Sequence, residues 1–315
     1  MTKSIKLKLS KIKYSGNSIG DDIRVEIEIL NQFLRIDKTI KVGTTAEINK
    51  DLGKFETDQK LFKANTRIAI IEKDILFNDV GNINGNIEIN TSVTKPKQFV
   101  YKIQIKETRS IFGKFWGKAV ANFEITLEAT VSDAMRYIPD EGDGWLKVKF
   151  ENGKIVSLPA YLKVKIERNN NKREYFTILE GAYRGELASV KLKDNGLSNL
   201  ISDVEYGSVA RASYSISKKI FTLNDKKYTT VDYKGIPWKK GLYDIEIPDY
   251  PHGVPGTYLE AQRPRIWFRI GHTGERYLHA GSRSLGCMTI IETSRWMEIY
   301  NVLIKARKPD FMSVG

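Results

Sequence analysis

The sequence predicts a mainly β protein with more than one domain. Period-two alternation of apolar and polar residues recurs along the chain, as in Ile5/Leu7/Leu9, and such alternation is typical of half-buried strands. Gly, Asn and Asp residues that favour turns separate the runs. A chain of 315 residues with 41% hydrophobic and 10% aromatic residues has enough apolar material for about two or three domains.

Residues 1–130 are expected to form an antiparallel β-sandwich, because short alternating runs follow one another without a long amphipathic helix. The expected strands lie near residues 5–9, 23–29, 36–42, 68–70, 87–89, 100–105 and 123–127. The turn-rich run Pro-Asp-Glu-Gly-Asp-Gly at 139–144 places a domain boundary near 131–144.

A small β domain is expected at 131–204, and a third domain at 205–315. The middle strands are expected at 145–150, 155–158, 162–166, 175–179 and 189–192. The later strands are expected at 209–216, 220–223, 228–232, 242–247 and 265–270. A helix is expected near 294–307, because Trp296, Ile299 and Tyr300 recur at helical spacing. Thr293 or Ser294 is the expected N-cap.

The charge balance favours anionic partners. Lys and Arg number 51 and Asp and Glu number 38, so the net charge is +13. Nucleic acid, anionic lipid and bacterial wall polymer all fit this charge. The basic residues are spread along the chain rather than gathered in one arm, so no nucleic-acid partner is expected. The single cysteine excludes an intramolecular disulfide and a cysteine-cluster metal site.

That cysteine, Cys287, lies in the stretch that carries the candidate chemistry. Two of the three histidines, His272 and His279, precede it by 15 residues or fewer. A nucleophilic thiol needs a base, access and donors for an oxyanion. Gly286 lets the backbone turn tightly beside the sulfur, and Ser284 is placed to donate to the oxyanion or to brace the loop. The alternative is that Cys287 is a small buried apolar residue.

Residues 265–290 resemble the active-site segment of the L,D-transpeptidases, the YkuD-like catalytic domain of bacterial cell-wall enzymes. Residues 266–270 resemble the first strand of that segment, 277–281 its histidine strand, and Ser-Leu-Gly-Cys-Met at 284–288 its nucleophile loop. The chain departs from the family at Leu285, often His there, and at Thr289, usually Arg or Asn.

The resemblance implies an activity and roles for the residues of this segment. Cys287 would be the nucleophile and His279 the base, with His272 as the other candidate base. The substrates would be peptidoglycan stem peptides, the thioester being taken by an amine or by water, and catalysis would need no cofactor. The expected substrate-binding residues are Arg269, Arg276, Arg283 and Tyr277, since arginine binds carboxylates in a bidentate way.

The N-terminal region resembles the calcium- and lipid-binding sandwich of the "C-two" type. In that family, acidic residues from separate loops meet at one end of the sandwich. The corresponding residues here are Asp21, Asp22, Glu72, Asp74 and Asp79. The resemblance implies a Ca²⁺ site, since calcium takes oxygen ligands. The alternative is that these residues only satisfy backbone groups in turns.

The first ten residues alternate apolar residues with Lys, whereas a secretory signal has an unbroken apolar core of about 7–15 residues. A cell-wall enzyme without such a signal is expected to be cytoplasmic before export and to leave by a specialised secretion route, as a toxin or effector. The N-terminal sandwich would then dock to a membrane or to the secretion apparatus. The rival hypothesis is a non-catalytic membrane- or surface-docking protein.

Overall fold

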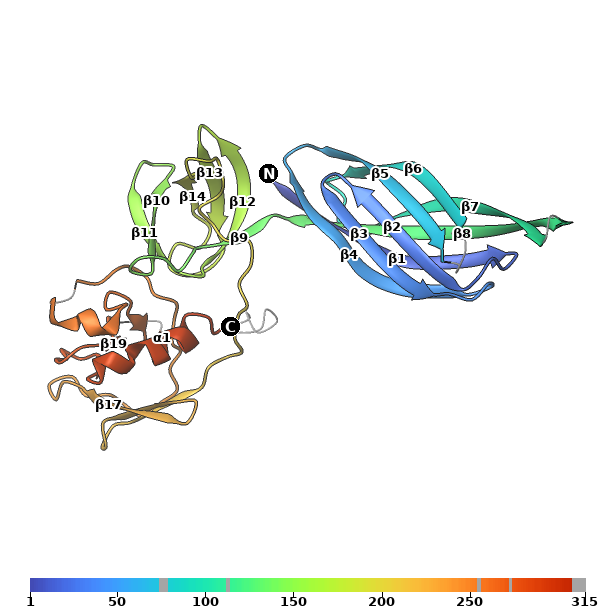
Figure 1. The fold of residues 1–315 in the computed structure, drawn as a ribbon. Coiled ribbons are helices and arrows are strands. Elements are labelled where there is room, and N and C mark those ends of the chain that lie inside the picture. Colours follow the sequence, from blue (N-terminus) through green and yellow to red (C-terminus); the bar gives the residue numbers. More distant parts are fainter. Residues whose placement is uncertain (74–78, 112–113, 254–255, 272–273, 308–315) are drawn as a thin grey trace. The chain divides into compact units, whose positions relative to one another are not determined.

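A computed structural model describes residues 1–73, 79–111, 114–253, 256–271 and 274–307, without the side chains of 107–118, 256–257 and 259. The chain divides into two compact units, Met1–Ala134 and Met135–Gly315. Both are built mainly from antiparallel strands, so the predicted mainly β fold is confirmed (Figure 1).

The first unit is a sandwich of two four-stranded antiparallel sheets. One sheet has the order β4-β1-β8-β7 and the other β3-β2-β5-β6. The strands are β1 Lys3–Gly16, β2 Asp22–Ile29, β3 Gln32–Thr39, β4 Thr45–Thr57, β5 Leu61–Glu72, β6 Asp79–Asn90, β7 Lys97–Ile111 and β8 Lys114–Asp133. Alternate residues of both sheets enter one shared core, for example Leu7 of β1 and Val25 of β2. The period-two pattern of the sequence therefore corresponds to one buried face on each sheet.

The second unit begins with a six-stranded antiparallel sheet of order β11-β10-β14-β13-β12-β9. Its strands are β9 Met135–Tyr137, β10 Trp145–Phe150, β11 Ile155–Pro159, β12 Lys163–Asn170, β13 Arg173–Ile178 and β14 Leu187–Lys191. The turn-rich run at 139–144 connects β9 to β10 within this sheet.

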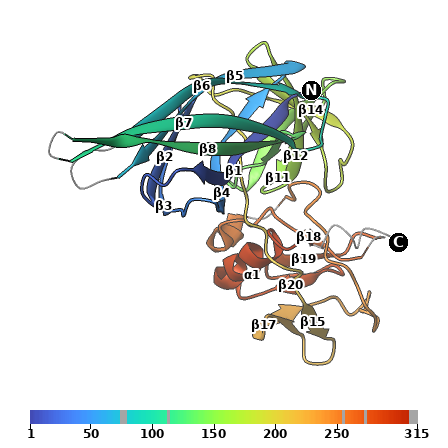
Figure 2. The same cartoon turned by 90° about the vertical axis from the view of Figure 1, so that its right-hand side faces the viewer.

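A second six-stranded sheet follows, with the order β15-β16-β17-β20-β19-β18. Its strands are β15 Ala212–Ser215, β16 Ile220–Leu223, β17 Lys226–Val231, β18 Phe268–Arg269, β19 Tyr277–Ala280 and β20 Met288–Ile290. β19 and β20 form a parallel pair, whereas the other neighbours in this sheet are antiparallel. Figure 2 shows β18, β19 and β20 side by side. This pairing brings together the histidine strand and the strand that begins after Cys287.

The predicted C-terminal helix forms, but it is shorter than expected. A 3₁₀ turn, η2 Thr293–Arg295, leads into α1 Trp296–Leu303, whose N-cap is Arg295. The expectation that Thr293 or Ser294 caps the helix is wrong, because Arg295 is the residue directly before the first α-helical residue. The Thr293 hydroxyl donates to Glu260 instead. Trp296, Ile299, Tyr300 and Leu303 are buried, as their spacing predicts.

The expected strand at 242–247 is also wrong. Only a single bridge forms there, between Ile245 and Ile270, while a short 3₁₀ helix, η1 Gly256–Ala261, precedes β18. Among the helices that the structure describes, none is long and apolar enough to cross a membrane.

Candidate functional site

Cys287 lies in a tight loop directly before β20 and is half-buried. The Ser284 hydroxyl braces this loop: it accepts a hydrogen bond from the Gly286 N–H at 3.1 Å and donates to the Cys287 carbonyl at 2.7 Å. Gly286 has φ +126°, a backbone conformation that residues with a Cβ rarely adopt. The loop geometry therefore requires both the small hydroxyl and the glycine that the sequence supplies.

The bracing also decides which amide is available to an oxyanion. The Gly286 N–H is occupied by Ser284. Within the described part of the chain, the Cys287 N–H has no hydrogen-bond acceptor. Of the N–H groups of Gly286 and Cys287, only that of Cys287 is free to donate to an oxyanion in this arrangement.

His279 lies on β19, directly opposite Thr289 of β20. Its Nδ1 is 2.9 Å from the Ala280 carbonyl oxygen and its Nε2 is 3.0 Å from Thr289 Oγ1. A carbonyl oxygen only accepts, so Nδ1 carries the proton and the neutral ring presents a lone pair at Nε2. The Thr289 hydroxyl donates to that lone pair, or to the Arg283 carbonyl at 3.3 Å.

The sulfur of Cys287 and the ring of His279 lie on neighbouring segments but are not hydrogen-bonded to each other. Leu278 of β19 pairs with Met288 of β20, the residue that follows Cys287. The sulfur lies 4.0 Å from the Glu275 carbonyl oxygen, and Nε2 is taken by Thr289. The structure therefore places the candidate nucleophile and the candidate base on neighbouring parallel segments inside the sheet, with His279 Nε2 engaged by a hydroxyl.

The charge states of the two groups are set mainly by burial. Burial lowers the pKa of His279 to about 4, and the hydrogen bond to the Ala280 carbonyl offsets this only in part. Burial likewise raises the pKa of the Cys287 thiol, against the opposing effects of the Tyr277 backbone and the Arg276 charge. The resting pair at neutral pH is thus a neutral thiol beside a neutral imidazole, and not a thiolate–imidazolium pair.

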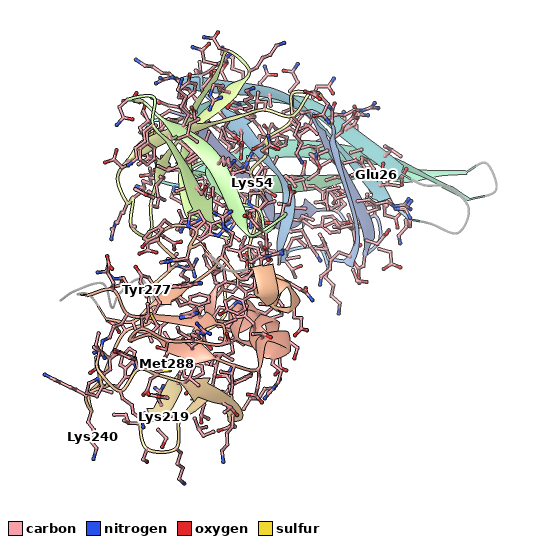
Figure 3. The ribbon with its side chains drawn as sticks, turned by 90° about the vertical axis from the view of Figure 1, so that its left-hand side faces the viewer. Glu26, Lys54, Lys219, Lys240, Tyr277 and Met288 are labelled. Atoms are coloured by element: carbon pink, nitrogen blue, oxygen red, sulfur yellow. The ribbon has the colours of Figure 1, made fainter. Side chains whose placement is uncertain are left out.

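The four predicted substrate-binding residues differ in their availability. Arg283 is exposed, whereas Tyr277 is buried and its hydroxyl donates to Asp249 at 3.0 Å. Figure 3 labels Tyr277 and Met288 at the site. Arg276 lies over the Trp238 ring at 4.6 Å and donates to the Pro237 carbonyl. Arg269 has a buried Nε with no hydrogen-bond partner in the described structure. Arg283 is therefore the most accessible cation beside the Cys287 loop.

The other candidate base, His272, lies outside the described residues, as does Asp74 of the predicted calcium site. Of the remaining carboxylates, Asp22 accepts a hydrogen bond from Thr39, and Asp79 pairs in register with Glu72. Asp21, which directly precedes Asp22 in the sequence, is half-buried. Within the residues that the structure describes, no three His, Cys, Asp or Glu side chains are grouped so as to hold a metal ion. The Ca²⁺ site stays a prediction that depends on Asp74.

Three contributors to the site were not expected from the sequence. The Ala280 carbonyl orients His279, and the Thr289 hydroxyl meets its base nitrogen. The Trp267 ring stacks on His279 at 3.9 Å between centroids. Thr289 had a sequence signal, since it lies two residues beyond Cys287 at the start of a strand, but a main-chain carbonyl has none.

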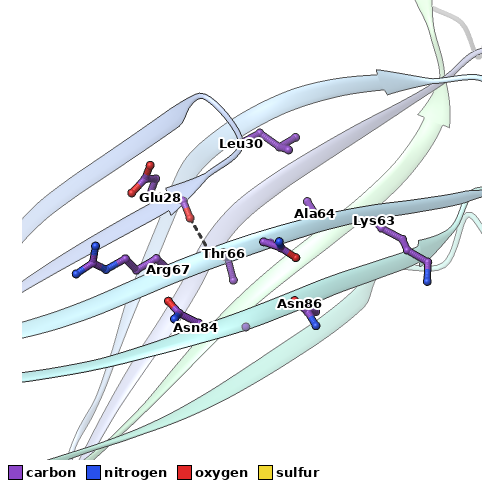
Figure 4. Close-up of a pocket in the computed structure, with 10 residues that line it drawn as sticks. Glu28, Leu30, Lys63, Ala64, Thr66, Arg67, Asn84 and Asn86 are labelled. Atoms are coloured by element: carbon purple, nitrogen blue, oxygen red, sulfur yellow. Dashed lines mark hydrogen bonds between the residues drawn. The ribbon is translucent and has the colours of Figure 1, made fainter.

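Two cavities have linings that do not include Cys287. One of about 650 Å³ lies on the first unit, where its polar lining includes Glu28, Lys63, Arg67, Asn84 and Asn86 (Figure 4). Its lining contains no cysteine or histidine. The other, of about 410 Å³, is lined by aromatic residues and by Met288. Met288 and Thr289 point to opposite faces of β20, so this cavity lies on the face away from His279.

Comparisons with known proteins identify no family for this chain. No family model matches it, and no curated protein matches it. A solved structure of human GIVD cytosolic phospholipase A2 is similar with a TM-score of 0.24 and 11% identity, over 62% of this chain and 31% of that chain. The same enzyme in complex with methyl gamma-linolenyl fluorophosphonate gives a TM-score of 0.25 and 10% identity, over 61% and 32%. This chain thus spans about a third of their length, and the likeness carries no functional argument.

Proposed function

We propose that the segment 205–315 is a cysteine-dependent acyl transferase or hydrolase that acts on peptidoglycan stem peptides, with L,D-transpeptidase-like chemistry. One observation supports this above the others. The half-buried Cys287 precedes β20, and the neighbouring strand β19 carries His279 with its ring oriented by the Ala280 carbonyl. A nucleophile, a base and a group that orients the base are the three parts that this chemistry needs.

The first step is proton transfer from the thiol to His279. Nε2 must exchange the Thr289 hydroxyl for the thiol, and the Arg283 carbonyl is a second acceptor to which that hydroxyl can turn. Because both groups are neutral at rest, His279 acts as a general base when the sulfur attacks, rather than holding a preformed thiolate. The Nδ1–H donates to the Ala280 carbonyl throughout and stabilises the imidazolium that forms.

The sulfur attacks the carbonyl at the L-centre of a diaminopimelate residue, and the C–S bond forms as the carbonyl electrons move to oxygen. The Cys287 N–H donates to that oxyanion. The C–N bond to D-alanine then breaks, and the proton on Nε2 passes to the leaving amine. The thioester that remains is taken by an amine, which gives a cross-link or an exchange product, or by water, which completes carboxypeptidase action.

We further propose that the protein reaches the cell wall by a specialised secretion route, with the β-sandwich of the first unit as the docking module. This part of the proposal is supported by the sequence alone. The start of β8 is basic and aromatic, with Lys114, Phe115, Trp116 and Lys118, and their side chains lie outside the described part of the structure.

The enzymatic proposal is tested by incubating disaccharide-tetrapeptides with the protein and analysing the products by mass spectrometry. The wild type should release D-alanine or exchange it for another D-amino acid, whereas Cys287→Ala should not. Ser282→Ala is the matched control, because this exposed hydroxyl lies in the same loop and bonds Tyr258 instead of the nucleophile turn. Identical product profiles for the wild type and Cys287→Ala would exclude the proposal.

A further inference from the structure

Trp267 is sandwiched between two imidazole rings. On one side the His279 ring lies 3.9 Å away between centroids, at an interplanar angle of 12°. On the other side the His252 ring lies 4.2 Å away at 5°, and Tyr250 stacks on the outer face of His252 at 4.2 Å. Tyr250, His252, Trp267 and His279 therefore form a column of four stacked rings, here called the ring column, which ends at the proposed base.

The register of the sheet explains the inner half of the ring column. Phe268 of β18 pairs with Leu278 of β19 in antiparallel register, so the preceding residue, Trp267, lies opposite His279. His279 in turn lies opposite Thr289 on β20. Side chains in one cross-strand row share a face of the sheet, and the row Trp267–His279–Thr289 is therefore built into the strand order.

The outer half is held by ring contacts and by hydrogen bonds of the neighbouring residues. The Trp267 indole N–H donates to the Pro264 carbonyl at 3.1 Å, which fixes the ring about its own axis. His252 is buried, and its Nε2 lies 3.5 Å from an Asp249 oxygen without a hydrogen bond in the described structure. The other Asp249 oxygen accepts the Tyr277 hydroxyl, and the Tyr277 ring meets His252 edge-on at 4.5 Å. The rings of the column thus have little freedom to tilt.

The hydrogen bonds of His279 leave one rotation of its ring unrestrained, and the ring column restrains that rotation. Ala280 and Thr289 hold the two nitrogens along the ring plane, but two in-plane bonds do not prevent the ring from rocking about the line that joins them. The flat indole of Trp267, at stacking distance, prevents this rocking. A general base must point its lone pair at the proton it accepts, so the rocking angle governs proton transfer.

We infer that Trp267 is the positioning residue of the His279 base, and that His252 supports it from behind as an aromatic spacer. This inference rests on the proposed function, because it assigns the residues that orient the base of that same site. It predicts that flat rings at 267 and 252 are required, and that aliphatic side chains of similar bulk are not sufficient.

The direct test uses NMR of the histidine Cε1–H groups. The chain has three histidines, so three signals are expected, and His→Gln variants assign them. The indole ring current should move the His279 signal upfield in the wild type. Trp267→Leu should abolish that displacement, Trp267→Phe should keep most of it, and His252→Phe should keep it better than His252→Ala. An unchanged His279 signal in Trp267→Leu would overturn the inference.

Kinetics with the disaccharide-tetrapeptide separate positioning from packing. We expect Trp267→Leu to lower kcat about tenfold or more with KM changed by less than about threefold, because a misplaced base affects the chemical step. Trp267→Phe should restore most of kcat. Loss of thermal stability without a loss of kcat in the folded fraction of Trp267→Leu would show that the ring column only packs the core, and would refute a positioning role.

The two proposals fail in different ways. If the wild type has no activity on the disaccharide-tetrapeptide but the His279 signal follows the substitutions as expected, the proposed function fails and the orientation of His279 by Trp267 stands. If activity depends on Cys287 and Trp267→Leu retains both kcat and the His279 signal, only the positioning role fails.

Discussion

Thr289 Oγ1 lies 3.0 Å from His279 Nε2, across the parallel strands β20 and β19, at the only ring nitrogen that is free to accept a proton. The proton on Nδ1 is committed to the Ala280 carbonyl. The hydroxyl therefore competes with the Cys287 thiol for the base. It has an alternative acceptor in the Arg283 carbonyl at 3.3 Å, so the competition is reversible.

Replacing this hydroxyl should make the base more available. In Thr289→Val the Nε2 lone pair of His279 loses its hydrogen-bond donor, so the pKa of His279 should rise. A lost hydrogen bond of about 1 kcal/mol corresponds to a roughly fivefold effect on the reactivity of the thiol. We expect Thr289→Val to react faster than the wild type with iodoacetamide at pH 7, and Thr289→Ser to match the wild type. Slower reaction of Thr289→Val would mean instead that the hydroxyl relays the proton.

The pH dependence of alkylation distinguishes a neutral pair from an ion pair. Because burial raises the pKa of the Cys287 thiol, iodoacetamide should react slowly below pH 8 and progressively faster in the alkaline range, with a midpoint above that of an unperturbed thiol. Whole-protein mass spectrometry is sufficient, since the chain has one cysteine. Rapid alkylation at pH 6 that disappears in His279→Gln would reveal a thiolate–imidazolium pair and contradict the assigned charge states.

His279 should also make the stability of its unit depend on pH. Its pKa is lowered to about 4 in the folded protein, against about 6.5 in an unfolded chain. The unfolded state thus binds more protons between these values, and stability falls as the pH falls through this window. The contribution lost between pH 7 and pH 4 is about 3 kcal/mol.

Urea unfolding of the wild type and His279→Gln at pH 7, 5.5 and 4 measures this difference. Four of the five tryptophans lie in 135–315, so tryptophan fluorescence reports mainly on that unit. As the pH falls, the free energy of unfolding of the wild type should decrease more than that of His279→Gln. A constant difference over the three pH values would show that His279 titrates normally.

The sequence predicts the β-sandwich because each strand has one buried face, and the alternation in Ile23, Val25, Ile27 and Ile29 is visible without tertiary information. The segment 242–247 misleads for the opposite reason. Its apolar residues lie in a long connection, where Leu242 and Tyr243 are exposed and a single bridge at Ile245 replaces a ladder. An alternating pattern therefore predicts a strand even where no neighbouring strand pairs with it.

The candidate site is predictable only in part. Cys287, His279, Ser284 and Gly286 can be selected by residue type and spacing, because each has distinctive chemistry. The partners of His279 cannot, since an alanine carbonyl leaves no trace in the sequence and the stacking of Trp267 depends on the register of β18 and β19. Residue types are local, whereas orientation is a property of the assembled sheet.

The last prediction concerns contacts between the segments 135–204 and 205–315, which lie in one unit. Arg263 places Nε at 3.2 Å and Nη2 at 3.1 Å from Asp140 Oδ1, and both side chains are mostly buried. Asp140→Asn would leave the guanidinium with a neutral partner in a poorly solvated place, so we expect a loss of about 2 kcal/mol. Asp143→Asn is the matched control, because the Arg265–Asp143 pair is about half exposed and should contribute less than about 0.5 kcal/mol. Urea unfolding followed by tryptophan fluorescence measures the free energy of unfolding of both variants. Equal losses for the two substitutions would show that the Arg263–Asp140 pair does not stabilise the contact between the segments.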